Sequence, residues 1–432
     1  MEKLSEDLIK KISKSKGEPE WMLEFRLNSY RKFKELDNPN FGPKLDIDYD
    51  EINYYKKVAN NETDWDRVSC DIRNKFKALG VIDAEEKHLS GVTNQLESEV
   101  IYHKGKDELE SKGVIFLSSD DALKNYPELF KEYFNNLVKY DENKFTALNG
   151  ALWSGGSFIY IPPNTKLDRP LQSYFRIDSI SLGQFERTII IVDEGSELSY
   201  IEGCTAESYS ANSLHAGVVE IYVKKNAKCK YSTIQNWSTD VYNLVTKRAL
   251  VLESGLMEWV DGNIGSKVTM KYPACILLGD NAMGNSISIA YAKENQILDA
   301  GAKMIHIGRN TKSNIVSKSI ASFSGQANYR GKVKICESAT NSYAQIKCDT
   351  IMLDNESISD TIPENVVLND SSILEHEATV SKISEEKLFY LMSKGLSENK
   401  AKELLVMGFI NDFKNELPME YAVELNRLLK EI

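Results

Sequence analysis

Hydrophobic and polar positions alternate in two different ways along this chain. Residues 1–95 and 384–432 carry apolar side chains at helical spacing, whereas residues 96–383 carry short apolar runs at strand spacing. The pattern therefore predicts an N-terminal helical region, a β core and a C-terminal helical region. Inside the core, one piece near 120–138 keeps helical spacing and is predicted to be a helix.

The N-terminal region contains clear helix boundaries. Ser5 is expected to cap a first helix that ends near Gly17, and Pro19 is expected to open a second. A further helix is predicted from about Trp65 to Leu79, closed by Gly80.

The tail shows the same kind of signals. Ser384, Ser397 and Pro418 each begin a predicted short helix with apolar residues along one side. Three short helices have little core of their own. Their apolar stripes must therefore pack on the β region or on another protein.

The β region holds more than ten short runs rich in Ile, Val, Tyr and Thr, separated by Gly, Asn, Asp and Ser. Such a series predicts a sandwich, a barrel or a β-helix. Hairpin signals are few, with Asp261-Gly262 as the one clear hairpin dipeptide, and Asn, Gly and Ser return at the corners. These features favour a coiled stack of strands, although we find no strict sequence repeat. Periodicity alone does not decide between a sandwich, a barrel and a β-helix.

One predicted strand has a polar inner face. From Cys229 to Trp237, alternation places Tyr231, Thr233 and Gln235 with these two residues on the bulkier side, which we predict to be the inner one. A buried Thr or Gln without a hydrogen bond would cost about 1–3 kcal/mol. The pattern fits either a satisfied hydrogen bond in the core or a polar interior passage, and the residues alone favour the first.

Metal-binding and sulfur-bearing side chains gather between residues 343 and 379. Cys348 lies on one predicted strand, and Glu375, His376 and Glu377 lie on the next. Thiol, imidazole and carboxylate are the groups that bind transition metals or carry sulfur. On a regular strand the two glutamates would point away from His376. This stretch taken alone favours a buried core cysteine, with Glu375, His376 and Glu377 on a solvated strand edge.

Composition narrows the class of protein. The chain has 432 residues, of which 42% are hydrophobic and 27% charged, which indicates a globular protein of two or three domains. A net charge of −11 argues against nucleic acid or an anionic membrane as the main partner. The chain begins without an apolar signal region and has no apolar run of bilayer length. We therefore expect a cytoplasmic location and no membrane contact.

Two local motifs are incomplete. The six cysteines are scattered and form no C-x-x-C pair, so no zinc ribbon or ferredoxin-type site is encoded locally. Any cluster would be assembled from distant positions or from a second subunit. The stretch 279–286 has the glycine spacing of a phosphate loop, but Asn285 replaces its lysine. We expect no ATP hydrolysis by this chain, and no enzymatic activity.

Several stretches, in order along almost the whole chain, resemble the SufB/SufD family of the SUF iron–sulfur cluster assembly system, and within it the SufB branch. The matching residues are 18–27, 183–188, 200–206, 230–237, 303–308, 348–349 and 374–379. The chain departs from relatives that carry a C-x-x-C-x-x-x-C motif near the N terminus, since only Cys70 remains there. The resemblance therefore gives no support for a cluster site in the N-terminal region.

The resemblance implies a right-handed parallel β-helix that serves as a scaffold for nascent iron–sulfur clusters. It implies a complex with the ATPase SufC, docked on the C-terminal helices, and with SufD or a second SufB-like chain. Cys204 would accept persulfide sulfur from a cysteine desulfurase system. Cys348, with Glu377 and His376, would assemble and hold a transient cluster.

The resemblance also implies an internal route between the two thiols, lined by Arg176, Thr233, Gln235, Trp237 and Lys247. A reduced flavin is a candidate source of electrons. Two alternatives remain: a structural partner of the SufD type, and a β-helix enzyme acting on carbohydrate, for which no paired acidic residues stand out.

Overall fold

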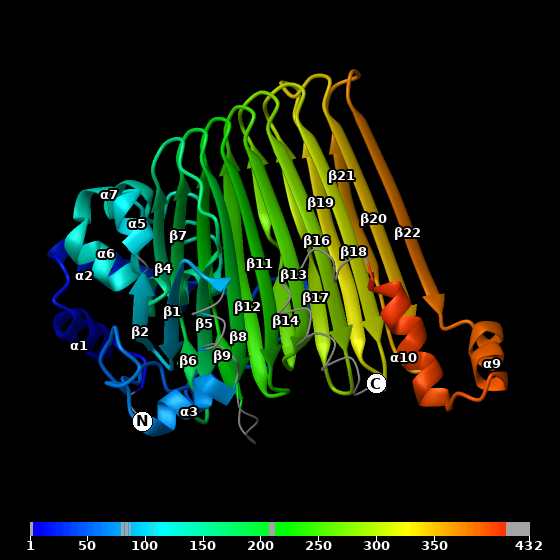
Figure 1. The fold of residues 1–432 in the computed structure, drawn as a ribbon, viewed down its shortest axis with the longest axis horizontal. Helices are drawn as coiled ribbons and strands as arrows, with labels where there is room; N and C mark the ends of the chain where they lie inside the picture. The colour runs from blue at the N-terminus through cyan, green and yellow to red at the C-terminus, as the bar shows by residue number, and fades with distance from the viewer. Residues whose placement is uncertain are drawn as a thin grey trace.

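The computed structural model describes residues 3–411, apart from 79–81, 83–84, 86–87, 106 and 207–211. The chain forms a parallel β-solenoid of about 8 turns, with helices in its N-terminal and C-terminal regions (Figure 1). The predicted mainly-β fold with helical ends is confirmed, and the coiled stack is the correct choice among the three all-β alternatives.

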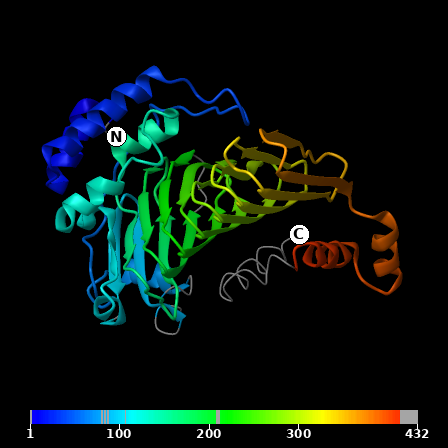
Figure 2. The ribbon, with the colours of Figure 1, turned by 90° about the horizontal axis from the view of Figure 1, so that it is seen from above.

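Two sheets face each other across the interior (Figure 2). The first sheet contains, in spatial order, β2 (Glu99–Gly105), β1 (Gly91–Leu96), β5 (Leu171–Ile177), β8 (Glu197–Ala206), β11 (Lys228–Trp237), β13 (Leu256–Gly265), β16 (Met283–Ala292), β18 (Lys312–Ala321), β20 (Tyr343–Met352) and β22 (Ile373–Lys382). From β1 to β22 every neighbouring pair is parallel.

The second sheet is built from the strands that alternate with these along the chain. Its main path contains β21 (Thr361–Val367), β19 (Gln326–Ile335), β17 (Ile297–His306), β14 (Val268–Lys271), β12 (Val241–Val251), β10 (Val218–Val223), β7 (Arg187–Val192), β4 (Ser157–Ile161) and β3 (Ile115–Ser118). Three short strands join it from the side, namely β6 (Gly183–Gln184), β9 (Ser213–His215) and β15 (Ala274–Leu277).

The corners repeat even though the sequence does not. Two residues before each of six successive strands of the first sheet, the backbone adopts the left-handed conformation with φ between 54° and 69°. The residues at this corner are Gly195, Asn226, Ser254, Asn281, Asn310 and Asn341. Glycine and asparagine tolerate this conformation best. The structure therefore repeats about every 30 residues in the backbone conformation of its corners, as in other solenoids.

Several predicted element boundaries need correction. The dipeptide Asp261-Gly262 is not a hairpin but lies inside β13, because its strand continues without a turn to Gly265. The predicted helix near 120–138 is two helices, α6 (Ser119–Asn125) and α7 (Pro127–Tyr133). Pro127 causes the break, since it lacks an N–H and disfavours helical geometry in Tyr126.

The N-terminal helices cover one end of the solenoid. Ser5 caps α1 (Glu6–Lys16), which ends at Gly17, and Pro19 precedes α2 (Glu20–Glu35), as predicted. The third helix, α3 (Cys70–Ala78), begins later than expected, and its predicted closure at Gly80 lies outside the described residues. Two more helices, α5 (Asp107–Ser111) and α8 (Lys144–Leu152), were not predicted.

The C-terminal helices lie at the opposite end (Figure 2). Ser384 caps α9 (Glu385–Ser393) and Ser397 caps α10 (Glu398–Phe409), as predicted, whereas the helix predicted from Pro418 lies outside the described residues. Val406 and Ile410 pack against the outer face of the first sheet. No residue of α9 is buried. Among the described residues, no helix is both long and apolar enough to cross a membrane.

Candidate functional site

A continuous row of polar side chains runs along the interior of the first sheet. Because side chains alternate along each strand and the strands are in parallel register, one inward-facing residue of each strand lies beside the next. The members of this row, one from each strand between β8 and β20, are Glu202, Thr233, Asp261, Ser288, Ser317 and Cys348. All six are buried. The row therefore joins the neighbourhood of Cys204 to Cys348.

Two lysines of the second sheet complete this polar interior. The Lys247 Nζ lies 2.9 Å from a carboxylate oxygen of Glu202, and the Lys271 Nζ lies 3.0 Å from one of Asp261. Burial alone would raise the pKa of both carboxyls, but the lysine ammonium groups hold each pKa below its ordinary value. The interior therefore contains two compensated ion pairs rather than isolated charges.

Amide and imidazole groups extend the network beside the first ion pair. Gln235 accepts hydrogen bonds from Asn243 at 2.8 Å and from Lys271 at 3.2 Å. His215 bonds to Asn243 and to Glu186, each at 2.8 Å. These contacts provide hydrogen-bond partners for the buried amide of Gln235, on the face of β11 that the sequence assigned to the interior, whereas the indole nitrogen of Trp237 has none among the described residues.

The predicted route residues separate into two groups. Thr233, Gln235 and Lys247 belong to the buried network, and Trp237 packs against the His215 ring at 4.7 Å between centroids. Arg176 belongs to the other group. It lies one residue beyond Phe175, which pairs with Cys204, so alternation places its side chain on the outer face of the sheet beside Asp178. The structure does not bring Arg176 to the other four.

Cys204 is a buried thiol next to a carboxylate. It is 2% exposed, and its Sγ lies 3.8 Å from Glu202 and 4.0 Å from the side-chain amide of Gln235. Burial, followed by the charges of Glu202 and Glu186, raises the pKa of Cys204 well above its usual range. In this conformation Cys204 is therefore a protonated thiol that donates to Glu202.

Cys348 lies at the far end of the row with an imidazole beside it. Its Sγ is 3.9 Å from Nε2 of His376, and Nδ1 of His376 accepts a hydrogen bond of 3.1 Å from Asn365. Burial raises the pKa of Cys348 to about 12, with a partial offset from the Tyr329 hydroxyl. Burial also lowers the pKa of His376, so the imidazole is neutral and its Nε2–H faces the sulfur.

Glu377 does not share this site. The strand β22 is regular throughout, so Glu377 points away from His376, and its carboxylate lies 3.8 Å from Lys347 on the outer face. Glu375 is on the same outer face, where it accepts a hydrogen bond from Tyr343. Of the residues predicted at this end, the structure brings Cys348 and His376 together and leaves Glu377 apart.

The described residues contain no group of three or more His, Cys, Asp or Glu side chains arranged to hold a metal ion. Cys348 and His376 thus form a pair of potential ligands. They lie on β20 and β22, at the end of the solenoid where β21 and β22 are the last strands of their sheets.

Sequence reasoning missed most of the charged interior. Glu202 and Lys271 were not singled out, and Asp261 was assigned to a hairpin, although each lies at an alternate position of a predicted or flanking strand. Tyr329, opposite Cys348, was missed as well. The usable signal was the alternation itself: in β13, Trp259, Asp261 and Asn263 fall on the same face.

Comparisons with known proteins find relatives along almost the whole chain. Residues 175–409 match the family described as "SUF system FeS cluster assembly, SufBD core domain", and residues 16–173 match "SufBD protein N-terminal region". Relatives from Staphylococcus saprophyticus, Staphylococcus epidermidis and Staphylococcus aureus are each 57% identical to the chain over 429 residues. The match covers 99% of this chain and 92% of each relative, and each is named an iron–sulfur cluster assembly SufBD family protein. The chain therefore belongs to the SufBD family of iron–sulfur cluster assembly proteins.

Proposed function

We propose that this chain is the scaffold on which nascent iron–sulfur clusters are assembled before transfer to apo-proteins. The observation that carries the proposal is the buried polar row, which ends near one thiol, Cys204, and at another, Cys348. Hydrophobic solenoid cores do not need such a row, because burying polar and charged groups is unfavourable unless each is paired. The family comparison favours this role over a carbohydrate enzyme.

Sulfur would be taken up at Cys204. Once Cys204 is exposed to the donor, its thiol loses its proton to water, and the resulting thiolate attacks the outer sulfur of a persulfide on the donor protein, which breaks the donor's S–S bond. A new S–S bond then forms at Cys204 while the donor leaves as a thiolate. Because Cys204 is buried, the segments that cover it must move before a donor can reach it. The ammonium group of Lys247, which lies 2.9 Å from Glu202, would stabilise the thiolate that this step creates.

Replacing Cys204 with serine is expected to abolish persulfide labelling of the chain after incubation with a cysteine desulfurase and cysteine. Serine keeps the size of the side chain but cannot form a persulfide. Cys229→Ser is the matched control, since Cys229 is equally buried but lies at the opposite end of its strand. Mass spectrometry under non-reducing conditions measures the labelling. Full labelling of Cys204→Ser would move sulfur uptake to Cys229, Cys275 or another thiol.

The cluster would form at Cys348 and His376, with further ligands from a partner chain. Exposed apolar residues Ile373 and Val380 lie on β22, and Val367 lies on β21. An unpaired apolar sheet edge of this kind is a site for pairing with another chain. This supports a complex with SufD or with a second copy of this chain, in which two chains share one ligand set.

The C-terminal helices would dock the ATPase SufC. In α9, Phe389 is 74% exposed and Met392 is 41% exposed, and a spacing of three residues puts them on one side of the helix. ATP hydrolysis would take place in SufC. This chain would not itself be an enzyme, in keeping with Asn285 at the position of the phosphate-loop lysine.

A double substitution, Phe389→Ser with Met392→Ser, is expected to weaken SufC binding at least about 30-fold, as for loss of an aromatic interface anchor. The fold should persist, since α9 buries no residue on the solenoid. Phe323→Ser is the control, because Phe323 is also exposed (60%) but lies at a corner of the solenoid. Isothermal titration calorimetry with SufC measures binding. Equal affinity of both variants and the unmodified chain would place the docking surface elsewhere.

A second candidate function is that of a structural partner of the SufD type. The observation that favours it is the small ligand set, since the described residues offer only a Cys–His pair at the open end. Anaerobic reconstitution of the isolated chain distinguishes the two roles: a scaffold acquires iron and sulfide, and a structural partner does not. In either role we expect a cytoplasmic location, and a reduced flavin stays a predicted electron source.

A further inference from the structure

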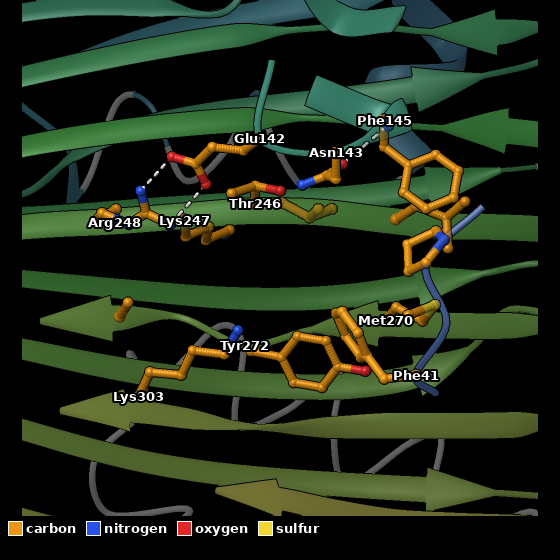
Figure 3. A pocket seen from close by; sticks show the side chains of 14 residues that line it. Phe41, Glu142, Asn143, Phe145, Thr246, Lys247, Arg248, Met270, Tyr272 and Lys303 are labelled. Carbon is orange, nitrogen blue, oxygen red and sulfur yellow. Dashed lines mark hydrogen bonds and ion pairs between the residues drawn. The ribbon is translucent and has the colours of Figure 1, made fainter. Parts of the chain in front are cut away.

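A small pocket lies on the outer face of the second sheet, away from the polar row. Its floor comes from β12 and from the segment between β14 and β15, and its walls come from the residues around Phe41 and Glu142 (Figure 3). Arg248, Tyr272 and Lys303 line it, and its volume is about 90 Å³. A space of this size holds a small polyatomic group rather than a single water.

Lys303 provides an unneutralised positive charge at this pocket. Its Nζ lies 5.2 Å from the centre of the Tyr272 ring and 5.8 Å from that of Phe41. Figure 3 shows the lysine extending along the pocket toward Tyr272. Within the part of the chain that the structure describes, no carboxylate lies within ion-pair distance of this ammonium group.

The neighbouring cations are neutralised by partners of their own. Arg248 bonds to both carboxylate oxygens of Glu142, at 2.5 and 2.9 Å. Arg330, whose guanidinium lies 5.8 Å from the centre of the Phe41 ring, bonds to Asp299. Lys332, the register neighbour of Lys303, bonds to Glu364. These partners leave Lys303 as the cation in this group that can accept an external anion.

The surroundings also make the charge on Lys303 unfavourable in the empty pocket. Partial burial, together with the nearby charges of Arg248 and Lys332, lowers the pKa of Lys303. A negative group placed against the ammonium would reverse this effect, because an opposite charge favours the charged form of a lysine.

We propose that this pocket binds a small oxyanion, a carboxylate or phosphate group, against the ammonium of Lys303. The rings of Tyr272 and Phe41 lie beside the ammonium, and Arg248, held in place by both carboxylate oxygens of Glu142, also lines the pocket. The size of the pocket admits the charged group and a few attached atoms, which points to a small metabolite or a free ion. Lys247 also lines this pocket, but its ammonium group pairs with Glu202 in the interior and not with the proposed anion.

Competition for the lysine amine tests the proposal on the intact chain. The rates at which an acylating reagent modifies Lys303 and Lys332 are measured by peptide mass spectrometry, with increasing inorganic phosphate, with increasing acetate, and with chloride at equal ionic strength. At about ten times the dissociation constant, an anion should slow modification of Lys303 about tenfold, because the free fraction falls by that factor. The rate of modification of Lys332 should change no more with phosphate or acetate than it does with chloride at equal ionic strength.

The three probes give distinct outcomes. Protection by phosphate alone identifies a phosphate site, protection by acetate alone a carboxylate site, and protection by both a general oxyanion site. Protection that chloride reproduces, or equal slowing at Lys303 and Lys332, overturns the proposal. As a second measurement, the protecting anion should raise the melting temperature of the unmodified chain and of Lys332→Gln, but not of Lys303→Gln. An equal rise in Lys303→Gln would also overturn it.

Discussion

Cys348→Ser should yield a folded chain that has lost most of its iron and sulfide. Serine is a poor replacement for thiolate toward iron, so a cluster held at this position cannot form. The substitution in a buried position should lower the free energy of unfolding by only about 1–2 kcal/mol. The measurement is iron and acid-labile sulfide content after anaerobic purification with the partner proteins, beside the melting temperature of each preparation.

Two neighbours serve as comparisons for Cys348. His376→Ala should also reduce the cluster content, because Nε2 faces the sulfur at 3.9 Å. Glu377→Ala should have a smaller effect, because its carboxylate lies on the outer face with Lys347. A Cys348→Ser chain with full iron and sulfide would remove this residue from the mechanism. A larger loss in Glu377→Ala than in His376→Ala would mean that β22 rearranges when a partner chain binds.

Lys247→Met is expected to destabilise the fold strongly. The side chains of Lys247 and Glu202 are 0% and 1% exposed and lie 2.9 Å apart. Removing one member of such a pair leaves an uncompensated charge in the interior and lowers the free energy of unfolding by about 3–5 kcal/mol. The loss is measured as the shift in the midpoint of urea denaturation, provided that the slope of unfolding free energy against urea concentration is unchanged.

A surface pair provides the control for Lys247. Lys228 lies 3.2 Å from Glu197 with both side chains exposed, and Lys228→Met should change stability by about 1 kcal/mol or less. Adding Glu202→Gln to Lys247→Met should recover part of the lost stability, because it removes the unpaired carboxylate. Similar midpoints for Lys247→Met and Lys228→Met would show that the interior near Cys204 is solvated.

Local patterns were sufficient to predict the strands but not their contacts across the interior. The alternation in residues 229–237 predicted the correct inner face of β11. A pairing such as Glu202 with Lys247 joins residues 45 apart that lie on different sheets. Such pairings depend on the register of one sheet against the other, which no local pattern encodes.

The same limit applies to the cluster end. Cys348 and His376 come together because β20 and β22 are adjacent and in parallel register, with Ile346 opposite His376. The sequence indicated two successive strands, and on a regular second strand His376 and Glu377 point to opposite faces. The regular geometry of β22 decides that His376, rather than Glu377, faces the thiol.

The repeated corners fix the distance between Cys204 and Cys348 as a whole number of strand spacings. Cys204 and Cys348 lie on strands five steps apart in one sheet, which corresponds to about 24 Å at the usual strand spacing. Because six successive turns are closed by an equivalent left-handed residue, a whole turn in this part of the solenoid can be added or removed without changing the local geometry of its neighbours. The separation of the two thiols can therefore change only in increments of one strand spacing, about 4.8 Å.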